Sequence, residues 1–321
     1  MDKNFEYYFQ DIKNKRIKEK FVIVLGSGFN HFISKQKTVL NDWNCLLELL
    51  KDDFVSSGNY LLDFEKIIDG YKSPIYKNQK NIMSSEKENK LLKEIASKIK
   101  NVQDSVLKNK SEMYPTYIFN PNFVSDIICL NFDTIAEEIC QRSYKPESIK
   151  KGFVKITDTG EEALVHLTTK YTEFNYSENK KIRFWHPHGS ILKPTSIILS
   201  ARKYAQHIGT IERLRKHSKS QQRIQNKKDT WYDVLTHKPV LIIGASISSS
   251  EWDLWSAFVN RERNYSKPEN KVCGKPIFQM RSTENGKYQI DKVNQEWFNP
   301  LFNENIPYDE QWLTLEKLLK Q

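Results

Sequence analysis

Short apolar runs recur along the chain, and each one ends in small or polar residues that lead into a helical pattern. The clearest runs are Phe21 to Leu25, Asp126 to Leu130 and Pro239 to Ile243. Runs of this length and composition are typical of strands buried on both faces of a parallel sheet. Two further strands are expected at Ile182 to Trp185 and at Pro276 to Met280, the second as the last parallel strand.

Between these runs the apolar residues follow helical spacing. Helices are predicted within residues 40–107, after Thr134, over 200–236, after Ser246 and over 312–319. Strands that alternate with helices predict an α/β fold, a Rossmann-like doubly wound parallel sheet with a helical insertion. Short β-like pieces at 153–156 and 163–168 are interpreted as an added hairpin outside the main sheet.

We expect a single domain over residues 1–321. It would carry a helical insertion at about 40–115 and a hairpin with a basic helical excursion at about 150–236. Trp43 with its neighbouring leucines, and the stripe of Trp252, Trp255 and Phe258, are expected to pack in the core.

Composition favours a soluble, cytoplasmic protein. Hydrophobic residues make up 38% of the chain, and no apolar run approaches the length of about 20 residues that spans a bilayer. The N-terminus resembles a short basic helix rather than a signal peptide. The four cysteines form no CxxC pair, which argues against a disulfide framework or a zinc ribbon, and Cys129 is expected to be a buried apolar residue.

The net charge of +10 raises nucleic acid as a partner. Lysine is abundant throughout the chain, so most of this charge is expected to be solvated surface. One stretch from Arg202 to Lys228 carries basic residues with Glu212 as its single acid. Binding of nucleic acid or of an acidic partner through this stretch is an alternative interpretation, and it is not favoured.

The unusual residues all follow predicted strands. In open α/β sheets, ligands bind at the carboxyl ends of the strands, so these residues are expected to share one crevice. They are Gly26, Ser27 and Gly28 after the first strand, Asn131 and Asp133 after the second, His188 and Gly189 after Trp185, and Gly244 and Ser246 after Ile243.

The glycine turn alone is weak evidence. A glycine pair at a strand-to-helix turn lets the backbone approach a pyrophosphate, with the helix N-terminus facing the negative charge. The turn lacks the third glycine of the dehydrogenase fingerprint, and no acidic residue closes a second strand about 20 residues later. A hydride-transferring dehydrogenase is therefore disfavoured.

In combination, the segments resemble a known family. Gly26-Ser27-Gly28, Asn131-Phe132-Asp133, His188-Gly189-Ser190 and Gly244-Ala245-Ser246 occur in this order in sirtuins. The chain looks most like the sirtuin-like proteins of bacterial antiphage defence, in which serine-rich turns such as Ser246 to Ser250 before Trp252-Asp253 are frequent.

The resemblance implies a site that binds NAD, with Asn131 and His188 as catalytic residues and no metal. It implies cofactor contacts from Gly26, Ser27, Gly28, Phe29, Asn131, Asp133, Gly244 and Ser246. Two departures from the family pattern matter. Phe29-Asn30 stand where a small residue and a serine are usual. A second histidine, His186, precedes Pro187, and this histidine is expected to be structural.

These residue types also suit the chemistry of NAD. Its nicotinamide is cationic and leaves without an acid, so an enzyme has to support an oxocarbenium-like ribose and deliver water or a hydroxyl. Asn131 can position that water, and His188 can accept its proton near neutral pH. The alternative interpretations are a structural turn for His188 and a helix N-cap for Asn131 and Asp133.

The predicted activity is hydrolysis of NAD to nicotinamide and ADP-ribose, as an effector of antiphage defence by NAD depletion. Sirtuin deacylases usually carry a four-cysteine zinc module after the catalytic histidine, and no cysteine lies between Gly189 and Pro239. The alternatives are a non-catalytic subunit that binds NAD or a related nucleotide, and a protein deacylase. Because unrestrained hydrolysis would harm the host, we expect control by a homo-oligomer or by a separate activating partner protein.

Overall fold

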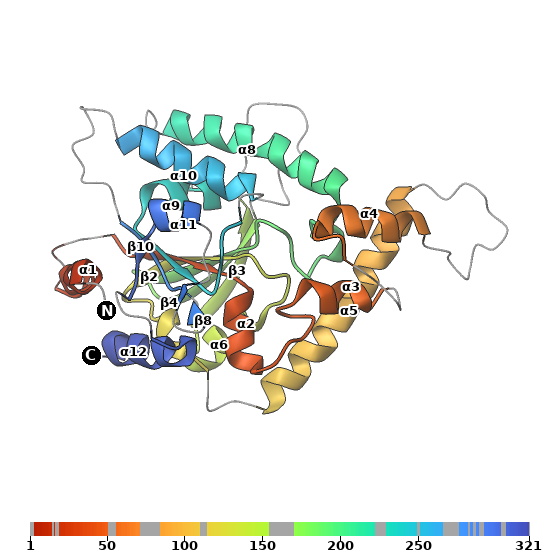
Figure 1. Ribbon diagram of the computed structural model, residues 1–321. Helices are drawn as coiled ribbons and strands as arrows, with labels where there is room; N and C mark the ends of the chain where they lie inside the picture. The colour runs from red at the N-terminus through yellow and green to blue at the C-terminus, as the bar shows by residue number, and fades with distance from the viewer. Residues whose placement is uncertain are drawn as a thin grey trace.

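The computed structural model describes most of the chain (Figure 1). The described residues are 3–14, 16, 19–50, 56–70, 84–109, 114–153, 170–221, 229–248, 251–265, 276–281, 283–284, 287–288, 292–302 and 306–320.

An eight-stranded sheet forms the centre of the molecule, with the strand order β10-β7-β6-β1-β2-β5-β4-β3. β1 lies inside the sheet and pairs in parallel with both β2 and β6. The sheet is mostly parallel, which confirms the predicted α/β, Rossmann-like class. Its strands are β1 (Phe21–Leu25), β2 (Val124–Cys129), β3 (Ser148–Phe153), β4 (Lys170–Ser177), β5 (Lys180–Trp185), β6 (Val240–Ile243), β7 (Ile277–Gln279) and β10 (Asn299–Pro300).

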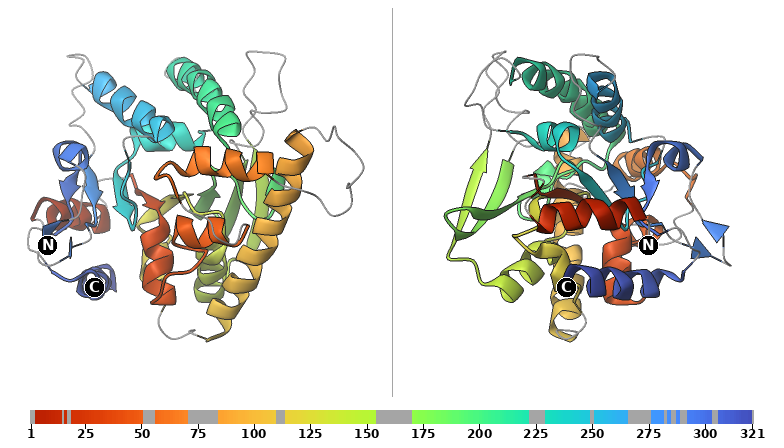
Figure 2. Two further views of the ribbon diagram at one scale, coloured as in Figure 1. Left: turned by 45° about the vertical axis from the view of Figure 1, so that its right-hand side comes forward. Right: turned by 90° about the vertical axis from the view of Figure 1, so that its left-hand side faces the viewer.

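Helices cover both faces of the sheet (Figures 1 and 2). On one face lie α8 (Ala201–Gln221), α9 (Trp231–His237) and α10 (Trp252–Tyr265). On the other face lie α2 (Ser27–Ser34), α6 (Ile135–Tyr144) and α12 (Tyr308–Lys320).

The alternation of side chains along β1 explains this layering. Val22 and Val24 pack in the hydrophobic cluster of α8, α9 and α10, whereas Ile23 and Leu25 belong to the cluster on the opposite face. A strand with both faces covered must be apolar at every position, and all five residues of β1 are buried.

The described residues between β1 and β2 are largely helical, as the apolar spacing predicts. It contains α3 (Trp43–Glu48), α4 (Tyr60–Gly70) and the long α5 (Ser84–Asn109), followed by a 3₁₀ turn, η3 (Thr116–Phe119). These helices lie together at one side of the sheet (Figure 2). The remaining elements are α1 (Lys3–Lys13), η4 (Pro194–Ser196), the short pair β8 (Thr283–Glu284) and β9 (Lys287–Tyr288), and α11 (Lys292–Trp297).

Two strands that the sequence analysis did not identify flank the predicted hairpin. β3 and β4 are antiparallel strands that extend the main sheet beyond β5. Most of the residues predicted as strands of the hairpin, 154–156 and 163–168, lie outside the described residues. β7 is also not the last parallel strand, because the two-residue β10 pairs in parallel with it. The single-domain boundary stays a prediction.

The basic stretch is only partly described, because the side chains of residues 217–228 are outside the description. Of its first members, Arg202 pairs with the buried Glu88, and Arg215 pairs with Glu212 at 2.5 Å. The Nζ of Lys203 donates to the Thr195 carbonyl at 2.7 Å. These side chains have partners within the protein, and a nucleic-acid partner stays untested.

Within the described part of the chain, no helix combines the length and hydropathy needed to cross a membrane.

A buried charge cluster stabilises the sheet. Asp126 on β2 is fully buried and accepts from the Nε of Arg183 and the Nζ of Lys238, both at 2.8 Å. The indole of Trp185 donates to the same carboxylate at 3.0 Å. Burial alone would raise the pKa of Asp126, but the two cations outweigh burial and hold it at about 2.

We expect Asp126→Asn to lower the free energy of unfolding at pH 7 by about 3 kcal/mol, because it leaves two partly buried cations without their counterion. The pKa of this carboxyl is lowered on folding, so its contribution is complete above the unfolded value of about 4 and is lost as the pH falls toward 2. Denaturant unfolding should therefore show a smaller gap between wild type and variant at pH 3 than at pH 7. Asp309→Asn, at an exposed ion pair with Lys35, is the control with a much smaller effect. A constant gap across this pH range would contradict the assignment.

Candidate functional site

Two glycine turns contact each other at the carboxyl ends of β1 and β6. A Cβ atom on Gly26 would lie 2.5 Å from the Gly244 carbonyl oxygen, and one on Gly28 would lie 2.7 Å from the Gly244 Cα. The amide of Gly28 donates to the Gly244 carbonyl at 2.7 Å. Gly244 itself has a φ of +63°, in the region that favours glycine. Close backbone packing therefore requires these three glycines.

This packing uses some of the amides that were predicted to face a phosphate. The Gly28 amide is bonded to Gly244, and the Phe29 amide donates to the Gly26 carbonyl at 3.1 Å. The ring of Phe29 is buried and contacts Phe119 and Trp312 in the core. Gly26 and Ser27 line the neighbouring pocket, so the turn faces the pocket mainly through these two residues.

Asn30, the second residue of the Phe29-Asn30 departure from the family pattern, has a structural role. Its side-chain amide is buried and donates to the Asp133 carboxylate at 2.6 Å and to the Leu40 carbonyl at 2.8 Å. The other carboxylate oxygen of Asp133 accepts from the amide of Ile135 at 3.0 Å. Burial raises the pKa of Asp133 to about 6, although these donors oppose the shift. Asp133 therefore ties α2 to the start of α6 and also lines the pocket.

Asn131 is held from two sides. Its side-chain amide donates to the Gly26 carbonyl at 3.1 Å, and its own carbonyl lies 3.1 Å from Nδ1 of His186. Nε2 of His186 lies 2.5 Å from Glu137 on α6. Burial disfavours the charged imidazole, but the Glu137 carboxylate outweighs burial and holds the pKa of His186 well above its usual value. His186 therefore contacts the Asn131 backbone, and the structural role expected for it stays a prediction.

His188 follows β5 in a turn that needs glycine next to it, since Gly189 has a φ of +90°. Its Nε2 lies 2.8 Å from Oδ2 of Asp253, which is fully buried on α10. Burial would lower the pKa of His188, but the Asp253 carboxylate outweighs burial and raises it. The carboxyl of Asp253 has its pKa held well below its usual range in spite of burial, chiefly by His188.

Two residues of α8 complete this cluster and were not anticipated from the sequence. Nε2 of His207 lies 3.1 Å from the same Asp253 oxygen, and the Tyr204 hydroxyl donates to the other oxygen at 3.3 Å. The ligand atoms of His188, His207 and Asp253 lie within 4.8 Å of one another, so they are also close enough to hold a metal ion. Hydrogen bonds account for every one of these contacts without a metal, and the predicted absence of one stays a prediction.

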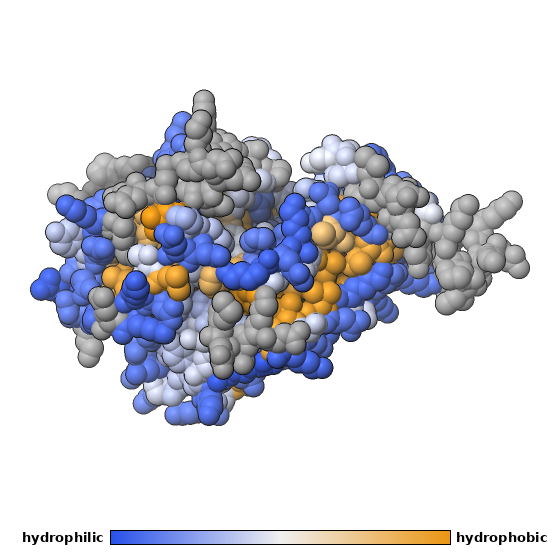
Figure 3. Space-filling view, turned by 60° about the horizontal axis from the view of Figure 1, so that its bottom comes forward, coloured by the Kyte–Doolittle hydropathy of each residue, from blue (hydrophilic) through white to orange (hydrophobic). Residues whose placement is uncertain are grey.

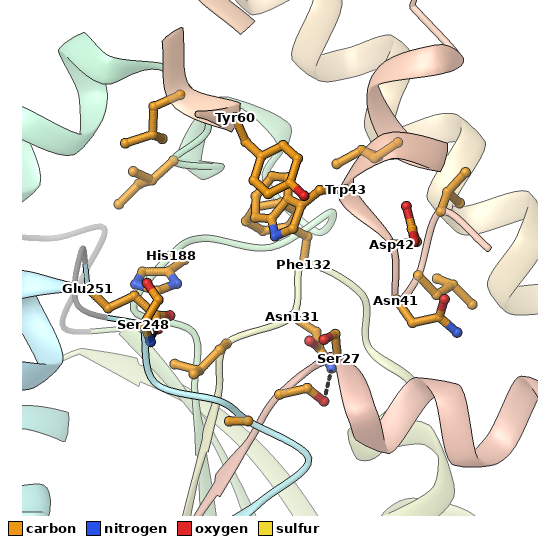
Figure 4. Close-up of a pocket in the computed structure, with 18 of the residues that line it drawn as sticks. Ser27, Asn41, Asp42, Trp43, Tyr60, Asn131, Phe132, His188, Ser248 and Glu251 are labelled. Carbon is orange, nitrogen blue, oxygen red and sulfur yellow. Dashed lines mark hydrogen bonds between the residues drawn. The ribbon is translucent and has the colours of Figure 1, made fainter. Parts of the chain in front are cut away.

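Most of the predicted residues line a cavity of about 540 Å³, within the range of small-molecule sites (Figure 4). Its lining includes Gly26, Ser27, Asn131, Asp133, His188 and Ser246, whereas Gly28, Phe29 and Gly244 lie behind it. Glu251 and Ser248 stand next to His188 in this lining (Figure 4). Burial raises the pKa of Glu251 to about 7, although His188 opposes the shift.

Two tryptophans that were expected in the core lie elsewhere. Trp43 is 38% exposed and lines the cavity, and Trp252 is 65% exposed. Trp255 and Phe258 are buried as predicted. Helical spacing identifies the face on which Trp43 and Trp252 lie, but not whether a neighbouring element covers that face.

Comparison with protein families gives a match to this chain. The model of the SIR2-like domain family matches residues 125–297, more than half of the chain. The match includes Asn131, Asp133, His188, Gly244 and Ser246, and it begins after the turn at Gly26 to Gly28. No curated protein matches the chain.

We expect Gly244→Ala to destabilise the protein by roughly 2 to 3 kcal/mol, because alanine is strained at positive φ and its methyl group would overlap the Phe29 amide. Gly209→Ala in α8 is the matched control. No atom lies within 4 Å of a Cβ there, so the helix should gain about 0.5 to 1 kcal/mol. Denaturant unfolding of both variants measures the difference, and equal stabilities would contradict the close-packing argument.

Proposed function

The chain belongs to the SIR2-like domain family, whose domains bind NAD, and we propose that it hydrolyses NAD to nicotinamide and ADP-ribose. The observation that carries the proposal is the shared pocket. Asn131 follows β2, His188 follows the neighbouring β5, and both line one cavity with Gly26 and Ser27 of the first turn. The carboxyl ends of adjacent parallel strands are where ligands bind in open α/β sheets.

The hydrogen bonds of His188 suit a proton acceptor. Because Asp253 accepts from Nε2, the neutral imidazole has its proton on that nitrogen and a lone pair on Nδ1. No hydrogen bond to Nδ1 is present among the described residues. Nδ1 is therefore the nitrogen that we assign to accept a proton from water or from a ribose hydroxyl. Asp253 acts as a positioning residue that fixes the ring.

Asn131 is suited to hold the nucleophile or the ribose. Its amide nitrogen is occupied by the Gly26 carbonyl, which orients the side chain. The side-chain oxygen is then the group left to accept a hydrogen bond from a water molecule or a ribose hydroxyl. Nicotinamide leaves as a neutral ring, so the pocket needs no acid for the leaving group.

Hydrolysis is favoured over protein deacylation by the cysteine positions. The chain has no cysteine between Cys140 and Cys273, so the four-cysteine module that usually follows the catalytic histidine of sirtuin deacylases is missing. The resemblance to antiphage defence proteins supports a role as an effector that depletes NAD. A non-catalytic NAD-binding subunit is the second candidate, and turnover separates the two.

We expect purified protein to release nicotinamide from NAD, and we expect His188→Ala and Asn131→Ala each to lower the rate at least about 100-fold. Chromatography of nicotinamide measures the release. His31→Ala, at an exposed histidine of α2, is the matched control and should retain activity. Release that survives His188→Ala would refute its catalytic assignment. NAD binding without release, in the presence and absence of a cell extract, would favour the non-catalytic subunit.

We also expect activity to depend on self-assembly or on an activating partner, because free hydrolysis would exhaust the NAD of the host. Light scattering after size exclusion gives the mass of the particle, and NAD release from each fraction gives its activity. The expected result is activity confined to an oligomeric fraction or restored by extract. A monomer with full activity alone would overturn this expectation.

A further inference from the structure

Three aromatic side chains form one side of the cavity, and we call them the aromatic wall. They are Trp43 on α3, Tyr60 on α4 and Phe132 after β2. Trp43 and Tyr60 are stacked with ring centroids 5.5 Å apart and planes at 14°, and Trp43 meets Phe132 edge to face at 5.9 Å. Figure 4 shows Trp43 and Tyr60 across the cavity from Ser27 and Asn131.

Packing alone does not account for the aromatic wall. Trp185, Trp231 and Trp312 are completely buried, whereas Trp43 keeps 38% of its surface exposed at the cavity. Hydrophobic surface also gathers on the side of the molecule where α3, α4 and α5 lie (Figure 3). Because Trp43 is partly exposed and lines the cavity, a planar ring bound there can pack against it in an offset arrangement.

The charge of the lining selects the kind of ring. Among the described residues, the cavity is lined by the acids Asp42, Asp133 and Glu251 and by no lysine or arginine. Tryptophan is also the aromatic side chain that attracts cations most strongly. Both features favour a positively charged ring over a neutral one.

The position of the wall points to the same end of the ligand. Phe132 lies between Asn131 and Asp133 in the sequence, and its ring contacts Trp43 directly. The wall therefore adjoins the residue proposed to act at the bond between ribose and nicotinamide. Trp43 and Tyr60 precede residue 125, so they come from a part of the chain that the family match does not include.

We propose that the aromatic wall binds the cationic nicotinamide ring of NAD. This inference rests on the proposed NAD site and specifies which end of the molecule the helical insertion recognises. The ring loses its positive charge when the bond to ribose breaks, so the wall binds the substrate more strongly than the released nicotinamide. It contributes to substrate affinity more than to the bond-breaking step.

The test compares NAD with ADP-ribose, which lacks the nicotinamide. Dissociation constants are measured by calorimetry in a His188→Ala background, so that NAD is not consumed. We expect Trp43→Ala to weaken NAD binding about 10-fold and ADP-ribose binding less than about 2-fold. Trp43→Phe keeps a ring and should lose less NAD affinity, which guards against a variant that fails to fold. Trp252→Ala, at an exposed tryptophan outside the cavity lining, should leave both constants unchanged.

The outcomes separate this inference from the proposed function. Equal weakening of NAD and ADP-ribose would overturn it, because the wall would then bind a part that both share, such as adenine. Unchanged NAD binding in Trp43→Ala would overturn it as well. NAD binding that follows the expected pattern in a protein without hydrolysis would support the wall and contradict only the hydrolase. Failure of the parent protein to bind NAD would refute both.

Discussion

The contact between the turns after β1 and β6 is the constraint on which the rest of the site depends. The two strands pair in parallel, and their turns touch backbone to backbone because Gly26, Gly28 and Gly244 carry no side chains there. The contact fixes where α2 begins, and the Gly26 carbonyl in turn orients the Asn131 amide. One wall of the pocket therefore consists of backbone atoms. Because these atoms are closely packed, the two turns cannot shift relative to each other without a clash.

Two buried histidine–carboxylate pairs then position the side chains at the neighbouring strand ends. Glu137 holds His186 against the Asn131 carbonyl, and Asp253 holds His188. The two histidines are separated by Pro187 and face different partners, so one supports the backbone and the other lines the cavity. Each carboxylate comes from a helix on a different face of the sheet, α6 or α10, which links the site geometry to the packing of both layers.

The sequence predicts the strands and their ends well, because a strand buried on both faces is apolar throughout and its end is marked by glycine or a polar residue. It predicts less about pairs that form between distant segments. Asp253 is recognisable only as part of Trp252-Asp253. Its hydrogen bond to His207 depends on how α8 packs on α10, and its bond to His188 depends on how α10 packs beside the turn after β5. Trp43 shows the same limit, since its helical spacing is identical whether a cavity or the core lies beside it. The strands β3 and β4 were missed because short, polar, antiparallel strands at a sheet edge have no continuous apolar run.

The arrangement of charge suggests how recognition is divided within the pocket. A dinucleotide site often depends on amides at the first glycine turn, but the amides of Gly28 and Phe29 are bonded within the protein. Ser27 and the α2 dipole then remain at the turn, and no lysine or arginine is among the described residues that line the cavity. Weak anion binding at one end makes attraction at the other end more important. The stacked rings of Trp43 and Tyr60, across the cavity from Ser27, can provide that attraction for a cation, and the proposed nicotinamide contact then gives the helical insertion a part in substrate selection.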